Sequence, residues 1–322
     1  MPDLRDDVSE LFAAITGRQP DGLWSAPGRL VLLSATDGSS LSIAVDRRTI
    51  VAAGPRDDDV LRVVSAEFDQ AVEISLTDLD GVQGRAGWAT LPLGVARALG
   101  RSGGDLAAVP GIDLVIESNV PAGAGLGSSA ALASAVALAL DDLWRLGFDR
   151  PELAAAGHLA ESEFAALDSA PSDHLASLLG RHDAALLVDT RGEVESIDAG
   201  LAAAGVTVLV IETGLDSVAP TVSVERFGEA SDALRARDFD AFARALDEPD
   251  STGGEAALAA ETARENGARA ARVTSGGTLV TLAPVDAVSR IQVALDGAFA
   301  EHGFSAPEVY PVLASDGATR DA

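Results

Sequence analysis

Residues 121–131 read Pro-Ala-Gly-Ala-Gly-Leu-Gly-Ser-Ser-Ala-Ala, and an apolar run follows them to about residue 146. The three glycines at alternate positions permit backbone conformations with positive φ and let a ligand approach the main chain. Ser128 and Ser129 fall where a helix is expected to begin, and the free N–H groups and dipole of a helix N-terminus attract anions. This stretch, which we name the glycine loop, therefore predicts a site for the phosphates of a nucleotide.

Local physics leaves two interpretations of the two serines open. A hydroxyl at the start of a helix can reach a Mg²⁺ ion bound to phosphates, or it can be an ordinary N-cap that ends a flexible loop. A Walker-type loop is excluded, because the sequence has no lysine and no Gly-x-x-x-x-Gly-Lys-(Ser/Thr) pattern. Nucleotide binding would then depend on backbone N–H groups, the helix N-terminus, arginine and a metal ion.

The composition is that of a globular protein with one large or two moderate domains. The chain has 322 residues, of which 47% are hydrophobic and 23% charged. It has no cysteine, which excludes disulfides, thiolate metal sites and cysteine nucleophiles. No basic segment followed by an apolar run stands near the N-terminus, and the most apolar stretch, 130–140, is too short to cross a bilayer. We therefore expect a cytoplasmic protein.

The formal net charge is −27, and every cationic side chain other than histidine is arginine. Such a surface repels nucleic acid and anionic lipid, so we expect neither a nucleic acid nor a membrane as partner. Compositional drift in a GC-rich genome and adaptation to high salt both produce this excess of acid. Neither interpretation bears on the reaction.

Short strands and helices are expected on both sides of the glycine loop. Strands are predicted at residues 28–33, 41–46, 48–54, 71–76, 111–118, 184–189 and 206–211, the first two around a turn at 37–39. Helices are predicted at 91–100, from the loop to about 146, at 151–167 and at 173–179. The second half is richer in helix, with helices expected at about 223–247, 253–266 and 284–301 and short strands near Arg272, at 278–282 and at 308–313.

Strands and helices mix without a regular βαβ alternation, which favours an α+β fold. Gly192, Gly200 and Gly205 punctuate the chain and place a domain boundary near 191–205. We therefore divide the chain into an N-terminal domain, 1–195, that carries the glycine loop, and a C-terminal domain, 196–322. Trp24, Trp88 and Trp144 are expected in the core or at its rim, and the four histidines show no metal-ligand spacing.

The glycine loop resembles the second motif of the GHMP kinase superfamily, Pro-x-Gly-x-Gly-Leu-(Gly/Ser)-Ser-Ser-Ala. That superfamily includes galactokinase, homoserine kinase and mevalonate kinase, and this chain resembles galactokinase along nearly its whole length. Further matching segments, in the same order as in that family, are 26–33 (APGRLVLL), 161–166 (ESEFAA), 173–180 (DHLASLLG), 185–191 (ALLVDTR), 307–310 (PEVY) and 315–318 (SDGA). The family counterpart of 173–180 is Asp-Gln-Phe-Ala-Ser-Ala-Leu-Gly.

The resemblance implies a two-domain α+β GHMP kinase fold, with an N-terminal part like the second domain of ribosomal protein S5 and a GHMP C-terminal part. It also implies a kinase that uses ATP and Mg²⁺ to phosphorylate a sugar hydroxyl. The residues that would bind the nucleotide are Pro121, Gly123, Gly125, Leu126, Gly127, Ser128, Ser129 and Ala130.

Three further residues match positions to which the family assigns chemistry. Asp173 falls on the catalytic base, although Asp is also a preferred N-cap for the helix expected at 173–179. Arg29 falls on the arginine that pairs with this base or stabilises the transferring phosphoryl group, and its alternative is a surface or strand-end arginine in a salt bridge. Glu161 falls on the Mg²⁺ ligand, together with the hydroxyl of Ser129 or Ser128, and its alternative is a solvated helix face.

The chain departs from galactokinase where that family holds its sugar. The family has Gly-Glu-His-Thr-Asp-Tyr after its first strand, whereas residues 34–40 read Ser-Ala-Thr-Asp-Gly-Ser-Ser and leave Asp37 as the one candidate substrate residue. Before the base, Cys-Gly-Ile-Met is replaced by the residues 169–172, Ser-Ala-Pro-Ser. The third motif, Gly-Gly-Gly-Phe-Gly-Gly, is shortened to Thr-Ser-Gly-Gly-Thr at 274–278. In the family that motif supports the phosphate loop.

Three functions are consistent with this pattern. The first is an ATP-dependent kinase that resembles galactokinase and acts on a small molecule, a sugar or related alcohol, as monomer or homodimer. The second is a catalytically impaired galactokinase-like protein that binds a nucleotide or sugar, because the sugar segment and third motif are altered. The third is a structural protein whose glycine loop binds nothing.

Overall fold

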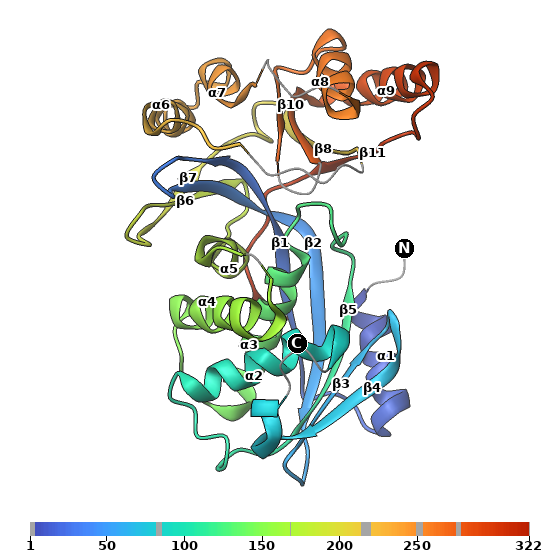
Figure 1. The fold of residues 1–322 in the computed structure, drawn as a ribbon, viewed down its shortest axis with the longest axis vertical. Helices are drawn as coiled ribbons and strands as arrows, with labels where there is room; N and C mark the ends of the chain where they lie inside the picture. The colour runs from blue at the N-terminus through green and yellow to red at the C-terminus, as the bar shows by residue number, and fades with distance from the viewer. Residues whose placement is uncertain are drawn as a thin grey trace.

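The computed structural model describes residues 4–81, 86–167, 169–213, 220–248, 254–274 and 278–321. Within them an eight-stranded sheet and a four-stranded sheet each carry their own helices. Figure 1 shows the smaller sheet with α6 to α9 at the top and the larger sheet with α1 to α5 below. The α+β fold expected from the sequence is confirmed.

The larger sheet has the strand order β12-β1-β2-β5-β3-β4, with β6 on β2 and β7 on β6. Its strands are β1 (Gly22–Ser34), β2 (Ser40–Pro55), β3 (Val60–Ser65), β4 (Phe68–Ser75), β5 (Ile112–Ser118), β6 (Ala184–Val188), β7 (Val194–Asp198) and β12 (Thr319–Arg320). β3 and β5 run parallel and the other paired strands antiparallel. The predicted turn at 37–39 joins β1 to β2.

Helices cover both faces of this sheet. The elements are α1 (Leu4–Thr16), the 3₁₀ turns η1 (Leu76–Gly81) and η2 (Gly87–Ala89), α2 (Thr90–Arg101), α3 (Ser128–Trp144), α4 (Arg150–Leu159), the π-helical turn η3 (Ala160–Ala165) and α5 (Pro171–Leu179). Val8 and Phe12 of α1 pack on one face, and α2 to α5 enclose the main core on the other. α3 is buried almost all round, because its many alanines let neighbouring elements approach closely.

The smaller sheet has the antiparallel order β11-β8-β10-β9. Its elements are β8 (Val206–Glu212), α6 (Val224–Arg235), α7 (Phe239–Leu246), α8 (Glu255–Glu265), β9 (Ala270–Val273), β10 (Thr278–Pro284), the 3₁₀ turn η5 (Val285–Ala287), α9 (Val288–His302) and β11 (Glu308–Val312). Side chains alternate along β8: Leu209 and Ile211 pack under α8 and α9, while Val208 and Val210 face the other way.

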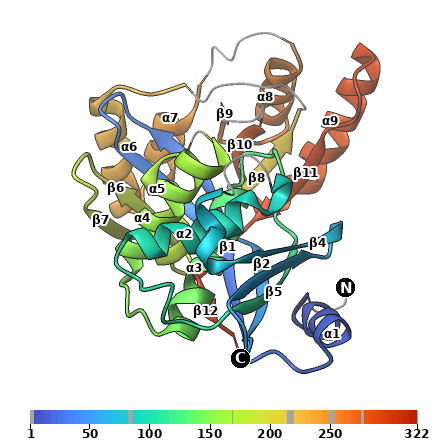
Figure 2. The same cartoon turned by 60° about the horizontal axis from the view of Figure 1, so that its bottom comes forward.

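That other face of β8 joins a core that both sheets share. Val208 and Val210 belong to one buried cluster with Leu30 of β1 and Ile43 of β2, and with apolar residues of α6 and α7. The chain then returns after β11, and β12 pairs with β1 at the edge of the larger sheet. Figure 2 shows β12 there, beside the C-terminus. The division at 195/196 therefore stays a prediction, although the sheets do change between β7 and β8.

Several predicted boundaries are wrong for physical reasons. Residues 41–46 and 48–54 form one strand, β2, because the polar side chains between them face the smaller sheet: Leu313 donates to Asp46, and the Arg47 guanidinium lies over the Tyr310 ring. The helix expected at 223–247 is two helices, because Arg237 takes a φ of 55° and Asp238 caps α7. The sequence did not indicate α1, β3, β7 or β12.

The other helix predictions need smaller corrections. The helix expected at 151–167 gives way to the π-helical turn after Leu159 and ends at Ala166, which has a φ of 53°. The helix expected from 284 begins as a 3₁₀ turn and becomes α-helical at Val288. Among the described residues, no helix combines the length and the apolar character that crossing a membrane requires.

Candidate active site

The glycine loop has the backbone that its sequence predicts. Gly123, Gly125 and Gly127 take φ values of 80°, 68° and 64°, in the left-handed region that favours glycine. Gly127 is the N-cap of α3, and no side chain caps that helix. The interpretation of Ser128 or Ser129 as an ordinary N-cap is therefore wrong. Both serines stand in the first turn with their hydroxyls uncommitted to capping, which suits a site for an anionic ligand.

Arg29 of β1 connects the glycine loop to α5. Its Nη1 donates to the carbonyl oxygen of Gly125 at 2.7 Å, and its backbone N–H donates to that of Leu126 at 2.8 Å. Nε and Nη2 donate to the two carboxylate oxygens of Asp173 at 2.7 and 2.9 Å. The two side chains are only 13% and 12% exposed. This bidentate pair is buried rather than a surface ion pair, and its geometry is the strong form of a charge-assisted contact.

Asp173 stands in the first turn of α5 but is not the N-cap of that helix. The helix begins at Pro171, two residues earlier than predicted, because proline has the fixed φ that suits the first helical position. The N-cap is therefore Ala170, and Asp173 is the third residue of the helix. Its carboxylate makes one long contact, 3.4 Å, with the Ala170 N–H and is otherwise held by Arg29. The N-cap interpretation of Asp173 is wrong.

Glu161 lies in the π-helical turn and is fully buried, so the solvated-face interpretation is also wrong. Its Oε2 is 2.8 Å from Nε2 of His174. Burial alone would raise the pKa of Glu161, but the hydrogen bond and electrostatic attraction from His174 outweigh it. With help from the hydroxyls of Ser129 and Ser169, they lower that pKa to about 2. The carboxylate is therefore charged at neutral pH.

The other carboxylate oxygen of Glu161, Oε1, is buried without a hydrogen-bond partner. A buried, charged and unsatisfied acceptor is costly unless a ligand completes it. The hydroxyl of Ser129 interacts with the same carboxylate. A carboxylate oxygen and a hydroxyl are hard donors, and Mg²⁺ takes one or two carboxylates with phosphate oxygens and water. These residues fit a Mg²⁺ ion that phosphates help to bind.

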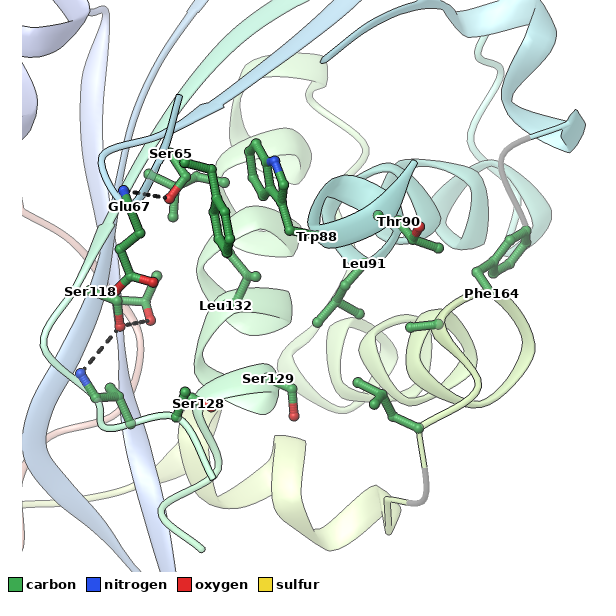
Figure 3. Close-up of a pocket in the computed structure, with 18 of the residues that line it drawn as sticks. Ser65, Glu67, Trp88, Thr90, Leu91, Ser118, Ser128, Ser129, Leu132 and Phe164 are labelled. Carbon is green, nitrogen blue, oxygen red and sulfur yellow. Dashed lines mark hydrogen bonds between the residues drawn. The ribbon is translucent and has the colours of Figure 1, made fainter. Parts of the chain in front are cut away.

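A cavity of about 550 Å³ begins beside Ser128 and Ser129. Figure 3 shows both serines at the start of α3 on one side of it and Trp88 on the other. The rings of Trp88 and Phe68 stack there, with centroids 5.1 Å apart and planes at 6°. Most other lining residues are apolar or carry hydroxyls, among them Leu91, Leu132, Phe164, Ser65, Thr90 and Ser118, and Glu67 also lines the cavity.

Sequence reasoning missed this cavity. It expected Trp88 in the core or at its rim, and it gave no weight to Phe68, which is 47% exposed. The available signal was weak: two aromatic residues outside apolar runs, in a chain with only 4% aromatics. Flat apolar side chains that stack at the wall of a cavity bind planar ligands well.

The side chain of Asp37, the predicted substrate residue, has another task. It is exposed, and its Oδ1 accepts from the backbone N–H of Ser39 at 3.0 Å within the β1–β2 turn. The residues Ser275, Gly276 and Gly277 of the expected third motif lie outside the described residues. The flanking Thr278 does reach the glycine loop, because its hydroxyl donates to the carbonyl oxygen of Ala124 at 2.7 Å.

The chain is similar to known proteins in both sequence and structure. The family described as GHMP kinases N terminal domain matches residues 90–181. A galactokinase from Streptomyces coelicolor is 30% identical over 384 residues, covering 97% of this chain and 97% of that protein. The crystal structure of Lactococcus lactis galactokinase complexed with galactose matches with a TM-score of 0.86 and 21% identity, over 99% of this chain and 100% of the other. Homoserine kinase from Cytophaga hutchinsonii matches with a TM-score of 0.66 and 17% identity, over 93% and 96%.

Proposed function

This chain belongs to the galactokinase family of GHMP kinases, and from that premise we propose that it transfers the γ-phosphate of ATP to a hydroxyl group of a sugar. It is a phosphotransferase with an alcohol group as acceptor. The observation that carries the proposal is the Arg29–Asp173 pair, which is hydrogen-bonded to the carbonyl oxygen of Gly125 in the glycine loop. A carboxylate and a phosphate-binding loop are thereby held in one site.

Phosphoryl transfer depends mainly on positioning and on stabilising charge. In the proposed reaction, Asp173 accepts a hydrogen bond from the attacking hydroxyl and then takes its proton. Arg29 fixes the direction of that carboxylate, because its two N–H groups hold both oxygens. The free N–H groups at the start of α3 bind phosphate oxygens, and the guanidinium adds positive charge beside them.

Glu161 and Ser129 would hold Mg²⁺, with Oε1 of the glutamate as the carboxylate ligand. The ion, when bound, neutralises charge on the phosphates and orients them. The cavity beside the serines would take the nucleoside, with its base against Trp88 and Phe68. Because adenine is planar and weakly polar, a largely apolar wall with a few hydroxyls is a suitable environment for it.

For the acceptor we propose galactose first, because two of the relatives named above are galactokinases and one of these was solved with galactose. The segment 34–40 lacks the Glu and His of the family motif, and Asp37 serves the β1–β2 turn. A site that has lost hydrogen-bond partners discriminates less between hydroxylated substrates. The acceptor therefore has to be identified with a panel of sugars rather than with galactose alone.

The experiment is a measurement of ADP release from ATP and Mg²⁺ with galactose and a panel of other sugars. We expect turnover with at least one sugar, and a fall of about 10²- to 10⁴-fold in the D173N variant. The matched control is D240N, because Asp240 also stands in the first turn of a helix, α7, but is 76% exposed there. No sugar-dependent ADP release above the level of D173N would contradict the proposal and favour a binding protein.

The geometry does not support the catalytically impaired alternative. Arg29 and Asp173 lie within hydrogen-bond reach of each other, which counts against this alternative. The comparisons likewise match a kinase over nearly the whole chain.

A further inference from the structure

His174 follows Asp173 in α5 and points to a different part of the site. Successive residues of an α-helix project about 100° apart, so Asp173 meets Arg29 while His174 meets Glu161. Both His174 and Glu161 are fully buried. In the family segment quoted above this position is glutamine, so the histidine is a feature of this chain.

The contact between the two side chains determines where the ring proton sits. Oε2 of the charged Glu161 carboxylate only accepts, so Nε2 of His174 must carry the hydrogen that joins them at 2.8 Å. Nδ1 of the same ring has no hydrogen-bond partner. The histidine therefore occupies one oxygen of Glu161 and leaves the other, Oε1, for a ligand.

The ring of His174 is confined by the backbone of α4. A Cβ atom added at Gly157 would lie 2.6 Å from Nδ1 and 3.0 Å from Cε1 of His174. Only glycine lets α4 pass so close to this ring. The ring of His158 packs against it from another side, with centroids 6.3 Å apart and planes at 61°. The imidazole therefore has little room to turn away from Glu161.

We propose that His174, held in place by Gly157, is a positioning residue that fixes the Glu161 carboxylate so that Oε1 is presented to Mg²⁺. This inference rests on the proposed function, because the ion is the one that the nucleotide would bring. Groups that hydrogen-bond a metal-ligating carboxylate orient it, and their loss commonly weakens metal binding by about 10- to 100-fold.

The test compares H174N with H174Q. Glutamine can place its amide N–H where Nε2 of histidine lies and so can still donate to Glu161, whereas the shorter asparagine cannot. Calorimetry measures ADP binding without Mg²⁺ and the Mg²⁺ concentration that half-saturates the ADP complex. We expect H174N to raise that Mg²⁺ concentration about tenfold or more, with ADP affinity in the absence of Mg²⁺ unchanged. H174Q should stay close to the wild type.

A second pair of variants tests the placement of the His174 ring without changing the histidine itself. G157A forces the ring away from its place, whereas the control G297A adds the same methyl group in α9, where a Cβ meets nothing within 4 Å. Only G157A should raise the Mg²⁺ concentration that half-saturates the ADP complex. This pair, which removes no polar group, keeps the inference testable if H174N does not fold.

Nitrogen NMR of the histidine rings gives a readout on the wild type itself. The His174 signal, assigned by its absence in H174Q, should show a proton on Nε2 and should shift when Mg²⁺ is added to the ADP complex. An unshifted signal, or H174N and G157A with wild-type Mg²⁺ half-saturation, would overturn the inference. If the wild type binds ADP with no effect of Mg²⁺, the proposed metal site fails and this inference fails with it.

Discussion

Gly127 takes a φ of 64°, and a Cβ placed there would lie 2.8 Å from Cγ of Arg29. The same glycine therefore serves two purposes: it caps α3 in the left-handed region, and it leaves room for the arginine that holds Asp173. Gly123 has a similar backbone, with a φ of 80°, but a Cβ there meets nothing within 4 Å. The two positions separate the effect of backbone strain from the effect of displacing Arg29.

We expect G123A and G127A each to lower the free energy of unfolding by about 1–2 kcal/mol, because both force an alanine into the left-handed region. Only G127A should also displace Arg29 and lower kcat, by about 100-fold, since small displacements of a catalytic group have effects of that size. Urea unfolding and steady-state kinetics measure the two effects. Equal kcat values for the two variants would show that Arg29 does not depend on this contact.

Tyr310 is the one tyrosine of the chain, so the titration of its phenol can be followed by absorbance. Burial raises its pKa above the ordinary value, and its hydrogen bond to the Glu212 carboxylate raises it further. A pKa raised by folding means stability that is present below the unfolded pKa, about 10, and lost as pH rises above it. The chain has one tyrosine, no cysteine and no lysine, so few other groups titrate there.

Tyrosinate absorbance should therefore show a midpoint well above pH 10 in the folded protein, and near that pH after unfolding. E212Q removes the negative charge and should lower the midpoint of the folded protein. The same midpoint in E212Q and the wild type would mean that burial alone protects the phenol.

For single residues, the sequence predicted which residues form the site better than it predicted what surrounds each of them. Arg29, Asp173 and the glycines could be named because a motif specifies the residue type at each position. The buried state of Glu161 could not be predicted, because its acidic neighbours, such as Glu163, are those of an exposed helix face. Its burial depends on His174, which reaches it from a different helix.

Among the elements, β10 of the smaller sheet reaches across to the glycine loop. Thr278, its first residue, donates its hydroxyl to the buried carbonyl of Ala124. Thr281, in the same strand, is also fully buried, but its hydroxyl has no partner. The two threonines form a matched pair, because valine has nearly the same shape and lacks the hydroxyl.

T278V should lower the free energy of unfolding by about 1–3 kcal/mol, because it leaves the Ala124 carbonyl unsatisfied. It should also weaken ADP binding, since the loop loses its support from the smaller sheet. T281V should be neutral or slightly stabilising, because it removes a hydroxyl that makes no bond. Thermal unfolding with and without ADP measures both effects, and a T278V protein that behaves like T281V would contradict the proposed support.

The apolar periodicity of the sequence predicted which segments are helices and which are strands. Where these elements begin and end depended on tertiary contacts. The hairpin of β1 and β2 was predictable because a turn sequence separates two apolar runs. The unbroken course of β2 was not, because Asp46 and Arg47 look like a break until their partners are known: Leu313, just after β11, and Tyr310 in β11. The start of α5 at Pro171 changed the role of Asp173 from a possible cap to a residue held by Arg29.

For the whole molecule, the order of the matching segments predicted a two-domain α+β fold, which the two sheets bear out. The return of the chain to the first sheet was not predictable, because β12 has only two residues and no apolar pattern. Arg48 secures this return by donating to the carbonyl oxygens of Asp316 and Gly317. The buried cluster shared by β1, β2 and β8 joins the two parts into one body around the site.

In the proposed reaction, Asp173, held by Arg29 beside the glycine loop, takes the proton of the sugar hydroxyl that attacks the γ-phosphate of ATP. Phosphorus NMR under single-turnover conditions, with the acceptor found in the sugar panel, follows the sugar phosphate directly, while calorimetry on the same preparations gives ADP affinity. We predict that D173N binds ADP as the wild type does and forms the sugar phosphate about 10²- to 10⁴-fold more slowly. Formation of the sugar phosphate by D173N at the wild-type rate would show that Asp173 is not the catalytic base.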